Sequence, residues 1–226
     1  MNTSYPQSLS AQVPPPALPL VHVFPRRELS KGDSLYREGD AADTLFRVEE
    51  GLLKLTIDLV TGKERIVSIA GPGDFIGAIT PSHVAQQESA EVLSPVALVQ
   101  VIPQAELGSS LHGDSLQREV HAAAGVRLKR MRNTLEDSEL PVPARLARTF
   151  VRLGERFGTL SDDNRVHLTL PLTHDNLAAM VGSARETTTA VLSDMRDHGL
   201  VAGTRGRYSF NRVDLQDYAL EASFAY

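Results

Sequence analysis

Residues 172–200 read LTHDNLAAMVGSARETTTAVLSDMRDHGL, a pattern that predicts two short helices joined by a glycine turn. Thr173 is a favourable N-cap for the first helix, and Gly182 tolerates the positive φ that such a turn requires. Ser183 and Glu186 have the spacing of a capping box for the second helix. This arrangement is typical of a helix-turn-helix, whose second helix enters the DNA major groove.

The second predicted helix supplies candidate DNA-reading residues. We expect its first turns to expose Arg185, Glu186, Thr188 and Thr189 toward base edges. A second interpretation is a helical hairpin in an all-α core. In that case Glu186 only caps its own helix and Arg185 is a solvated charge.

The segment that follows favours the DNA-binding interpretation. Residues 201–210, VAGTRGRYSF, alternate apolar and polar side chains on both sides of a glycine turn, which predicts a β-hairpin. A basic hairpin after a recognition helix is the wing of a winged helix. We expect Arg205 and Arg207 to lie against DNA phosphates. Thr173 and Ser183, at the helix ends, are further expected phosphate contacts.

The charge distribution agrees with a DNA-binding carboxy-terminal half. Residues 141–212 contain ten Arg, no Lys and seven Asp or Glu, a formal charge of about +3. The whole chain has a formal charge of −5, so the remainder carries about −8. Basic character is therefore concentrated where the helix-turn-helix lies, as an electrostatic footprint for DNA requires.

Composition limits the other classes of function. The 226 residues include no Cys, which excludes disulfides, thiolate-ligated iron–sulfur clusters and cysteine nucleophiles. No apolar run reaches the length of a membrane span, and the amino terminus has no signal-peptide pattern. These features predict a cytoplasmic protein without a membrane partner.

The first half predicts an antiparallel β-roll. Residues 1–20 are proline-rich and almost uncharged, as in a mobile arm. Glycine turns then recur about every ten residues up to position 107, and short β-prone runs lie between them. Four of these runs are TLFRVEE, LLKLTIDLV, RIVSIA and VALVQVI.

A long helix is predicted next, over residues 114–137, and Pro141 and Pro143 mark the hinge after it. Its apolar residues repeat every three or four positions, a narrow seam that suits helix pairing between two subunits. The alternative is that the seam packs on the β-roll of its own chain. The seam residues are Leu116, Val120, Ala124, Leu128, Met131 and Leu135.

The sequence therefore predicts an α+β fold in four parts. These are a flexible arm (1–20), a sensor-like β-roll or double-stranded β-helix (21–112), a dimerisation helix (113–138) and a winged helix (139–226). In this order the parts resemble the cyclic-AMP receptor protein and fumarate–nitrate regulator (CRP/FNR) family of bacterial transcription factors. The stretches that carry the resemblance are GDSLYREGD (32–40), LFRVEEGLLKL (45–55), GPGDFIG (71–77), VPARLARTF (142–150) and MVGSARETTTAVLSDMRDHGLV (180–201).

The resemblance implies a cyclic-nucleotide pocket whose phosphate contacts are replaced in this chain. Ala78 stands where cyclic-AMP-binding members have Glu, and Glu88-Ser89 stands where they have Arg-Ser. No Lys or Arg occurs between residues 65 and 118, and a carboxylate repels a phosphate that needs a cation. We therefore expect no cyclic-AMP binding. The candidate vestigial pocket comprises Gly77, Ala78, Glu88, Ser89, Arg130 and Met131.

The resemblance also assigns roles on the recognition helix. Arg185 matches the arginine that pairs with guanine, and Glu186 matches the glutamate that accepts from cytosine. Ala190 replaces a second recognition arginine, and it can at most touch a thymine methyl. The candidate base-reading set is Arg185, Glu186, Thr189 and Ala190.

The resulting hypothesis is a sequence-specific transcription regulator that binds a palindromic promoter site as a homodimer, with no cofactor or metal. Double-stranded DNA, a second copy of the chain and RNA polymerase are its expected partners. One alternative is the same regulator gated by an unidentified small molecule in the roll. A remote alternative is a metal-dependent enzyme, since β-rolls also house such sites. The sequence leaves open whether the protein activates or represses.

Overall fold

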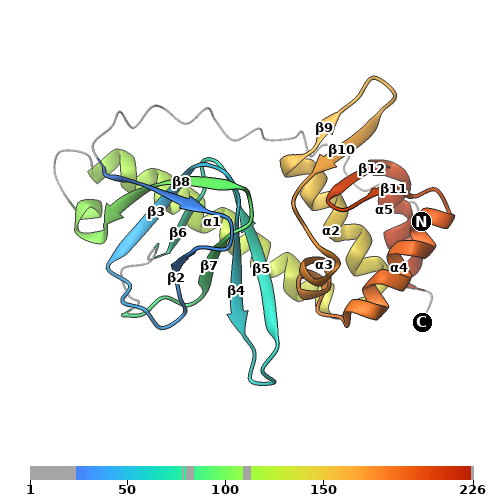
Figure 1. Ribbon diagram of the computed structural model, residues 1–226, viewed down its shortest axis with the longest axis horizontal. Helices are drawn as coiled ribbons and strands as arrows, with labels where there is room; N and C mark the ends of the chain where they lie inside the picture. Colours follow the sequence, from blue (N-terminus) through green and yellow to red (C-terminus); the bar gives the residue numbers. More distant parts are fainter. Residues whose placement is uncertain (1–23, 78, 80–83, 109–112, 225–226) are drawn as a thin grey trace, which may run out of the picture.

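In the computed structural model, which describes residues 24–77, 79, 84–108 and 113–224, a β-rich half and a winged-helix half flank one long helix (Figure 1). The predicted arm, residues 1–20, lies outside the described residues. The architecture confirms the predicted α+β class and the order of roll, long helix and winged helix.

Two four-stranded sheets, ordered β1-β8-β3-β6 and β2-β7-β4-β5, form the roll, and every strand pairing is antiparallel. Gly51 shows why glycine recurs between these strands. Its φ is 82°, and a Cβ there would lie 2.3 Å from the carbonyl oxygen of Val96. The strands are β1 (Arg26–Ser30), β2 (Ser34–Tyr36), β3 (Thr44–Glu50), β4 (Leu53–Asp58), β5 (Glu64–Ala70), β6 (Phe75–Gly77), β7 (Ser89–Val92) and β8 (Val96–Pro103).

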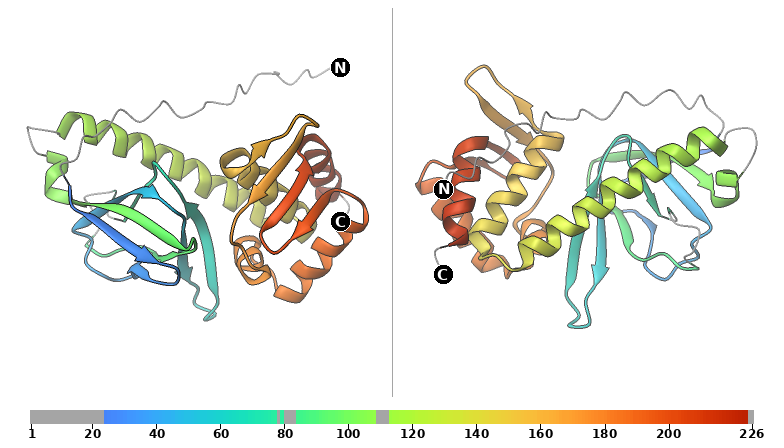
Figure 2. Two further views of the ribbon diagram at one scale, coloured as in Figure 1. Left: turned by 45° about the horizontal axis from the view of Figure 1, so that its top comes forward. Right: turned by 180° about the vertical axis from the view of Figure 1, so that it is seen from behind.

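A short 3-10 helix, η1 (Gln104–Gly108), precedes the long helix α1 (Gly113–Ser138). Seen from behind in Figure 2, α1 lies across one face of the roll before it reaches the winged helix. Leu116 and Val120 in its first turns are buried in a cluster with Leu45 and Ile102 of the roll. The first part of α1 therefore belongs to the core of its own chain.

This packing corrects the predicted dimer seam. Leu116 and Val120 contact the roll of their own chain, as the alternative interpretation held, and Ala124 packs at the edge of the same cluster. The remaining seam residues are exposed: Leu128 by 69%, Met131 by 60% and Leu135 by 70%. The same apolar repeat thus serves the core at one end of α1 and is left uncovered at the other.

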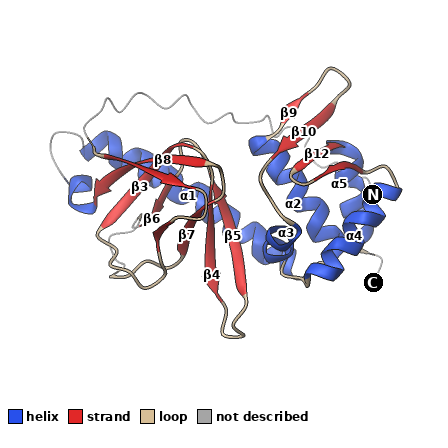
Figure 3. Cartoon of the chain, viewed as in Figure 1, coloured by secondary structure: helices blue, strands red, loops and turns tan. Residues whose placement is uncertain are grey.

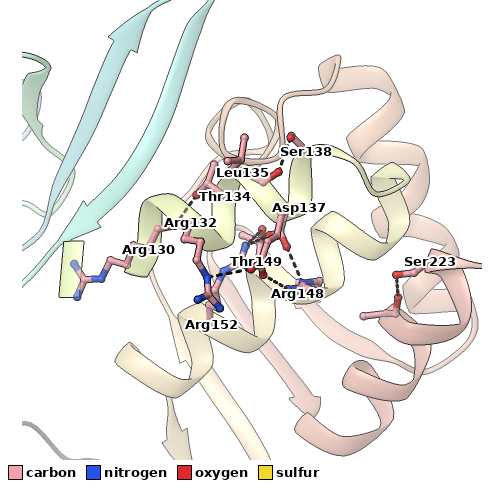
Figure 4. A network of polar contacts seen from close by, with 12 residues as sticks. Arg130, Arg132, Thr134, Leu135, Asp137, Ser138, Arg148, Thr149, Arg152 and Ser223 are labelled. Carbon is pink, nitrogen blue, oxygen red and sulfur yellow. Dashed lines mark hydrogen bonds and ion pairs between the residues drawn. The ribbon is translucent and has the colours of Figure 1, made fainter. Parts of the chain in front are cut away.

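A sharp elbow joins α1 to α2 (Val142–Phe157), and Pro at the start of α2 supplies a residue with no amide hydrogen to satisfy. Asp137 of α1 holds the elbow with two arginines of α2 (Figure 4). Its carboxylate lies 2.7 Å from Arg148 Nε and 2.5 Å from Arg152 Nη2, and its side chain is only 6% exposed. A buried carboxylate needs such partners, because one left alone would strongly destabilise the fold.

The carboxy-terminal half is a winged helix, and Figure 3 shows its helices around one small sheet. The sheet order is β11-β12-β10-β9. Phe150 of α2 contacts the rings of Tyr208 and Phe210 at its centre. The elements after α2 are β9 (Thr159–Leu160), β10 (Arg165–Thr169), α3 (His174–Val181), α4 (Arg185–Asp197), β11 (Val201–Thr204), β12 (Arg207–Asn211) and α5 (Arg212–Ser223).

The roll and the winged helix also share a core. Ile66 and Ile69 of β5 belong to the same buried cluster as Leu177 and Val181 of α3. Asp74, next to β6, forms ion pairs with Arg130 of α1 and Arg156 of α2. The two halves are therefore connected by packed side chains as well as by α1.

Candidate DNA-binding surface and roll cavity

The helix-turn-helix has the predicted cap and turn. Thr173 Oγ1 accepts a hydrogen bond from the Asn176 amide, and the Asn176 side chain accepts one from the Thr173 amide. Gly182 ends α3 with φ 63° and ψ 50°, the left-handed conformation that glycine adopts without strain. These local interactions fix the angle at which α4 leaves the turn.

The predicted capping box at the start of α4 is wrong. The N-cap is Ala184, which provides no side-chain cap, and Glu186 falls at the second helical position instead of the third. The Ser183 amide donates to the carbonyl of Ala178, so Ser183 closes α3. The first amides of α4 thus lack a side-chain cap, and donors at a helix start are suited to a phosphate.

Side-chain exposure on α4 matches the proposed reading face with one correction. Arg185, Glu186 and Ala190 are exposed, and Thr189 is half-buried. Thr188, which we expected to face base edges, is completely buried against the core. Thr187 is exposed instead, a candidate contact that the sequence interpretation missed.

Two residues of α3 touch this face, and neither was singled out from the sequence. Asp175 Oδ2 lies 3.5 Å from Arg185 Nη1. His174 Nδ1 lies 3.0 Å from Thr189 Oγ1. The first turn of α3 therefore orients two side chains that are expected to read DNA.

The wing carries exposed cations, as predicted. Arg205 and Gly206, with φ angles of 52° and 80°, form the turn between β11 and β12. Arg205 and Arg207 are exposed, and neither side chain forms a hydrogen bond or ion pair within the described part of the chain. Arg196 of α4 donates from Nε to the carbonyl of Gly203, 3.0 Å away, and so connects the wing to the recognition helix.

A cavity of about 370 Å³ lies between the roll and α1. Of the six predicted pocket residues, Gly77, Glu88 and Met131 line it, and Ala78 lies outside the described residues. Its other lining residues are Ala42, Ile79, Ala85, Gln86, Gln87, Ala124, Arg127 and Leu128.

Ser89 and Arg130 are not part of the cavity, which corrects the prediction. Ser89 Oγ accepts a hydrogen bond from the Glu38 amide. Arg130 Nη2 lies 3.5 Å from Asp74 Oδ1, at the junction with the winged helix. Arg130 therefore contributes to the contact between the two halves.

Glu88 is the most buried ionisable group of the cavity, with 3% of its surface exposed. Its carboxylate is in direct contact with Arg127 Nη2 and accepts a hydrogen bond from Tyr36 Oη, 3.2 Å away. Burial raises the pKa of Glu88 above its ordinary value, because water no longer stabilises the charge. Burial and the neighbouring carboxylate raise the pKa of Tyr36 well above its usual range.

Arg127 is the cation that the sequence interpretation missed. Residues 66–117 contain no Lys or Arg, but the cavity is also lined by α1, which follows this stretch in the sequence. Arg127 of α1 therefore supplies a cation that the local sequence lacks. The helical spacing of Ala124, Arg127 and Met131 was the available signal, since they share one face of α1. Within the described residues, no group of three or more metal-ligating side chains is found, and no helix is long and apolar enough to cross a membrane.

Comparisons with known proteins agree with both halves of the structure. Residues 26–110 match the cyclic nucleotide-binding domain family, and residues 144–218 match the Crp-like helix-turn-helix domain family. The chain is 26% identical to the CRP-like cAMP-activated global transcriptional regulator of Mycobacterium tuberculosis, over 77% of this chain and 78% of that protein. It is 28% identical to the transcriptional regulator LdrP of Thermus thermophilus, over 85% and 93% of the two chains.

Among solved structures, FixK2 from Bradyrhizobium japonicum has the same fold, with a TM-score of 0.73 and 20% identity over 87% of this chain and 98% of that one. The two domain matches, the relatives and this likeness agree with the order of parts along the chain. The chain belongs to the CRP/FNR family of transcription regulators and carries the family's helix-turn-helix DNA-binding domain.

Proposed function

We propose that this regulator binds a palindromic promoter site as a homodimer and does so without cyclic AMP. The observation that carries the proposal is the exposed start of α4, where Arg185, Glu186 and Ala190 lie on the surface beside a basic wing. An exposed helix face of this kind reads base edges, while the wing cations and the uncapped start of α4 suit phosphates. Arg205, Arg207, Thr173 and Ser183 are the proposed phosphate contacts.

The homodimer is supported by the uncovered end of α1. Leu128, Met131 and Leu135 lie at helical spacings of three and four, and each is more than half exposed. Covering such an apolar stripe with the same stripe of a second copy is a favourable way to remove it from water. A two-fold dimer places two recognition helices about 34 Å apart, which requires half-sites one helical turn apart.

Independence from cyclic AMP is supported by the Glu88–Arg127 pair. A cyclic phosphate entering the cavity meets a buried carboxylate, and the only cation among the described cavity-lining residues is already paired with it. Gating by a different small molecule is the second candidate. It is favoured by one observation, the cavity of about 370 Å³ between the roll and α1.

RNA polymerase is the proposed protein partner, and the cytoplasm is the proposed compartment, because a regulator of this family acts where transcription takes place. We propose no catalytic role, since the features at the surface of α4 and the wing are those of a DNA reader. The test is to select bound fragments from genomic DNA and to repeat the binding on the enriched sequence with and without cyclic AMP. We expect an inverted repeat and unchanged affinity. Loss of DNA binding without cyclic AMP contradicts the proposed independence from cyclic AMP. Absence of an enriched sequence contradicts the proposed palindromic promoter site.

A further inference from the structure

The junction between roll and helix-turn-helix contains two arginines without a counter-ion. Arg65 is on β5, the roll strand that packs beside α3, and Arg145 is in the first turn of α2 (Figures 1 and 2). Both side chains are half-buried. The two residues come from opposite halves of the molecule, so the pair exists only when the halves are docked.

Arg65 lies directly on the turn of the helix-turn-helix. Its Nη1 atom is 1.4 Å from the position that a Cβ on Gly182 would occupy. The guanidinium thus fills the space that only glycine leaves free, two residues before the α4 N-cap, Ala184. A charge from the roll is placed beside the segment that leads into the recognition helix.

Neither arginine is satisfied within the described residues. The Nε atoms of Arg65 and Arg145 are buried and have no hydrogen-bond partner, and neither side chain forms an ion pair there. Burial and the charge of Arg145 lower the pKa of Arg65. Two half-buried like charges repel each other, so the pair is unfavourable in the absence of an anion.

The other arginines of the junction show the contrast. Arg130 and Arg156 share Asp74, and Arg148 and Arg152 share Asp137. The fold therefore supplies carboxylates to neighbouring arginines but none to Arg65 and Arg145. Ile66 and Leu146, the chain neighbours of the two arginines, belong to one buried cluster, so both arginines flank the same junction. Their unpaired guanidinium donors match the oxygens of a phosphate, which arginine binds through two parallel hydrogen bonds.

We propose that Arg65 and Arg145 form a phosphate-binding site at the junction of the roll and the helix-turn-helix. The phosphate group belongs either to the DNA backbone or to a free phosphate compound. The first source rests on the proposed function and makes the roll part of the DNA interface, because a backbone phosphate beside the start of α4 would contact Arg65. In both cases the site is complete only when the roll and the winged helix are in contact, because each half supplies one of the two arginines.

The first arm of the test uses DNA-free protein and inorganic phosphate. Melting temperatures are compared in phosphate and in chloride at equal ionic strength for the wild type, Arg65→Gln, Arg145→Gln and the control Arg37→Gln. Arg37 is exposed on the roll, and its side chain has no partner in the described structure, so the control removes the same charge elsewhere. If the source is free phosphate, we expect phosphate at about five times its dissociation constant to raise the melting temperatures of the wild type and of the control. The increase should be about 2–4 °C larger than in the two junction variants.

The second arm uses duplex DNA at several salt concentrations. If the source is the DNA backbone, Arg65→Gln and Arg145→Gln each lower the salt slope by about one per subunit, and Arg37→Gln leaves it unchanged. Arg65→Lys keeps the charge and is expected to retain most of the slope. If Arg145→Gln does not fold, the comparison of Arg65→Gln with Arg65→Lys still tests whether the charge at this position contributes to the salt slope.

Each combination of results decides the proposal. A loss confined to the junction variants in either arm supports the site and names its source. The proposal is overturned if both junction variants behave like the wild type in both arms. It is also overturned if Arg37→Gln loses as much phosphate stabilisation or salt slope as the junction variants do. If the wild type binds no duplex, the proposed function fails, whereas the phosphate arm still tests the site.

Discussion

Glu88 of the roll and Arg127 of α1 form an ion pair across the cavity between these two elements. The pair connects residues 39 positions apart in the sequence and attaches the long helix to the roll. Burial of a charge pair is a weak source of net stability, because desolvation offsets most of the attraction. The ion pair has a clearer chemical consequence. The Glu88 carboxylate is already paired with Arg127, the cation that an anionic ligand in the cavity would need.

The first prediction concerns cyclic AMP. The wild type is expected to give no binding heat at micromolar nucleotide, whereas Glu88→Gln removes the repelling charge and frees Arg127. We expect the dissociation constant for cyclic AMP to fall by about tenfold or more in this variant. Calorimetry checks the change, with Glu28→Gln, an exposed position on β1, as the charge-matched control. Tight binding by the wild type contradicts the prediction.

The second prediction concerns pH. Burial raises the pKa of Glu88 in the folded protein above its ordinary value of 4.5, so the folded state holds this proton more tightly than the unfolded chain. Between the two pKa values the folded state binds more protons, and the free energy of unfolding therefore falls as the pH rises. Relative to Glu88→Gln, the wild type should lose stability as the pH rises above the ordinary value of 4.5. Urea denaturation at a series of pH values measures the free energy of unfolding of both proteins. The same dependence on pH in the wild type and in Glu88→Gln would refute the prediction.

Patterns within one element were predictable from the sequence. TLFRVEE coincides with β3 because alternating apolar residues and flanking turns define a strand locally. Gly182 was predictable for the same reason, since a turn between two helices needs a positive φ at one residue. The order of such elements was sufficient for the roll, the long helix and the winged helix.

Properties that depend on a neighbouring element were not predictable. Residues 187–189 are all Thr, and packing of α4 on its neighbours decides which of them is covered: Thr188 is buried on the same face as Leu192 and Met195. Leu116 and Leu128 have the same place in the apolar repeat, but only the first meets the roll. Arg127 and Asp175 gained their partners through folding in three dimensions, which spacing along the chain does not reveal.

The third prediction tests the dimer surface. Leu128→Glu and Met131→Glu put a charge on the exposed stripe of α1 and should convert a dimer into a monomer, because the charge would be buried between two helices. Val126→Glu is the control, since Val126 is 49% exposed on the opposite side of the same helix. Light scattering at micromolar protein measures the mass. A monomeric wild type, or equal loss in the control, contradicts the stripe as the interface.

The fourth prediction tests the contact between Gly182 and Arg65. Gly182→Ala forces an L side chain into a left-handed conformation, at a cost of about 1–2 kcal/mol, and also displaces the Arg65 guanidinium. In an Arg65→Ala background only the backbone cost remains, so the same substitution should be less destabilising. Urea denaturation of the four proteins in this cycle measures the coupling. Strict additivity would show that the two residues do not touch.

The fifth prediction separates base reading from phosphate binding. Arg185→Ala removes a bidentate base contact, so it should cost about 1–3 kcal/mol on the operator and relax preference at one base pair per half-site. Arg207→Ala removes at most a phosphate contact in the wing. It should weaken operator and scrambled duplex alike and lower the salt slope by about one per subunit.

Asp175 sharpens this comparison, because its carboxylate lies 3.5 Å from Arg185 and near the expected DNA backbone. An acidic group there is unfavourable for phosphate binding, so its positive contribution must be to orient Arg185. Asp175→Asn should therefore raise affinity for scrambled duplex and reduce the ratio of operator to scrambled binding. Fluorescence anisotropy on both duplexes at two salt concentrations measures this ratio for all three variants. If Arg185→Ala lost both duplexes equally while its fold stayed intact, Arg185 would be a phosphate anchor, and the base-reading face would lie elsewhere on α4.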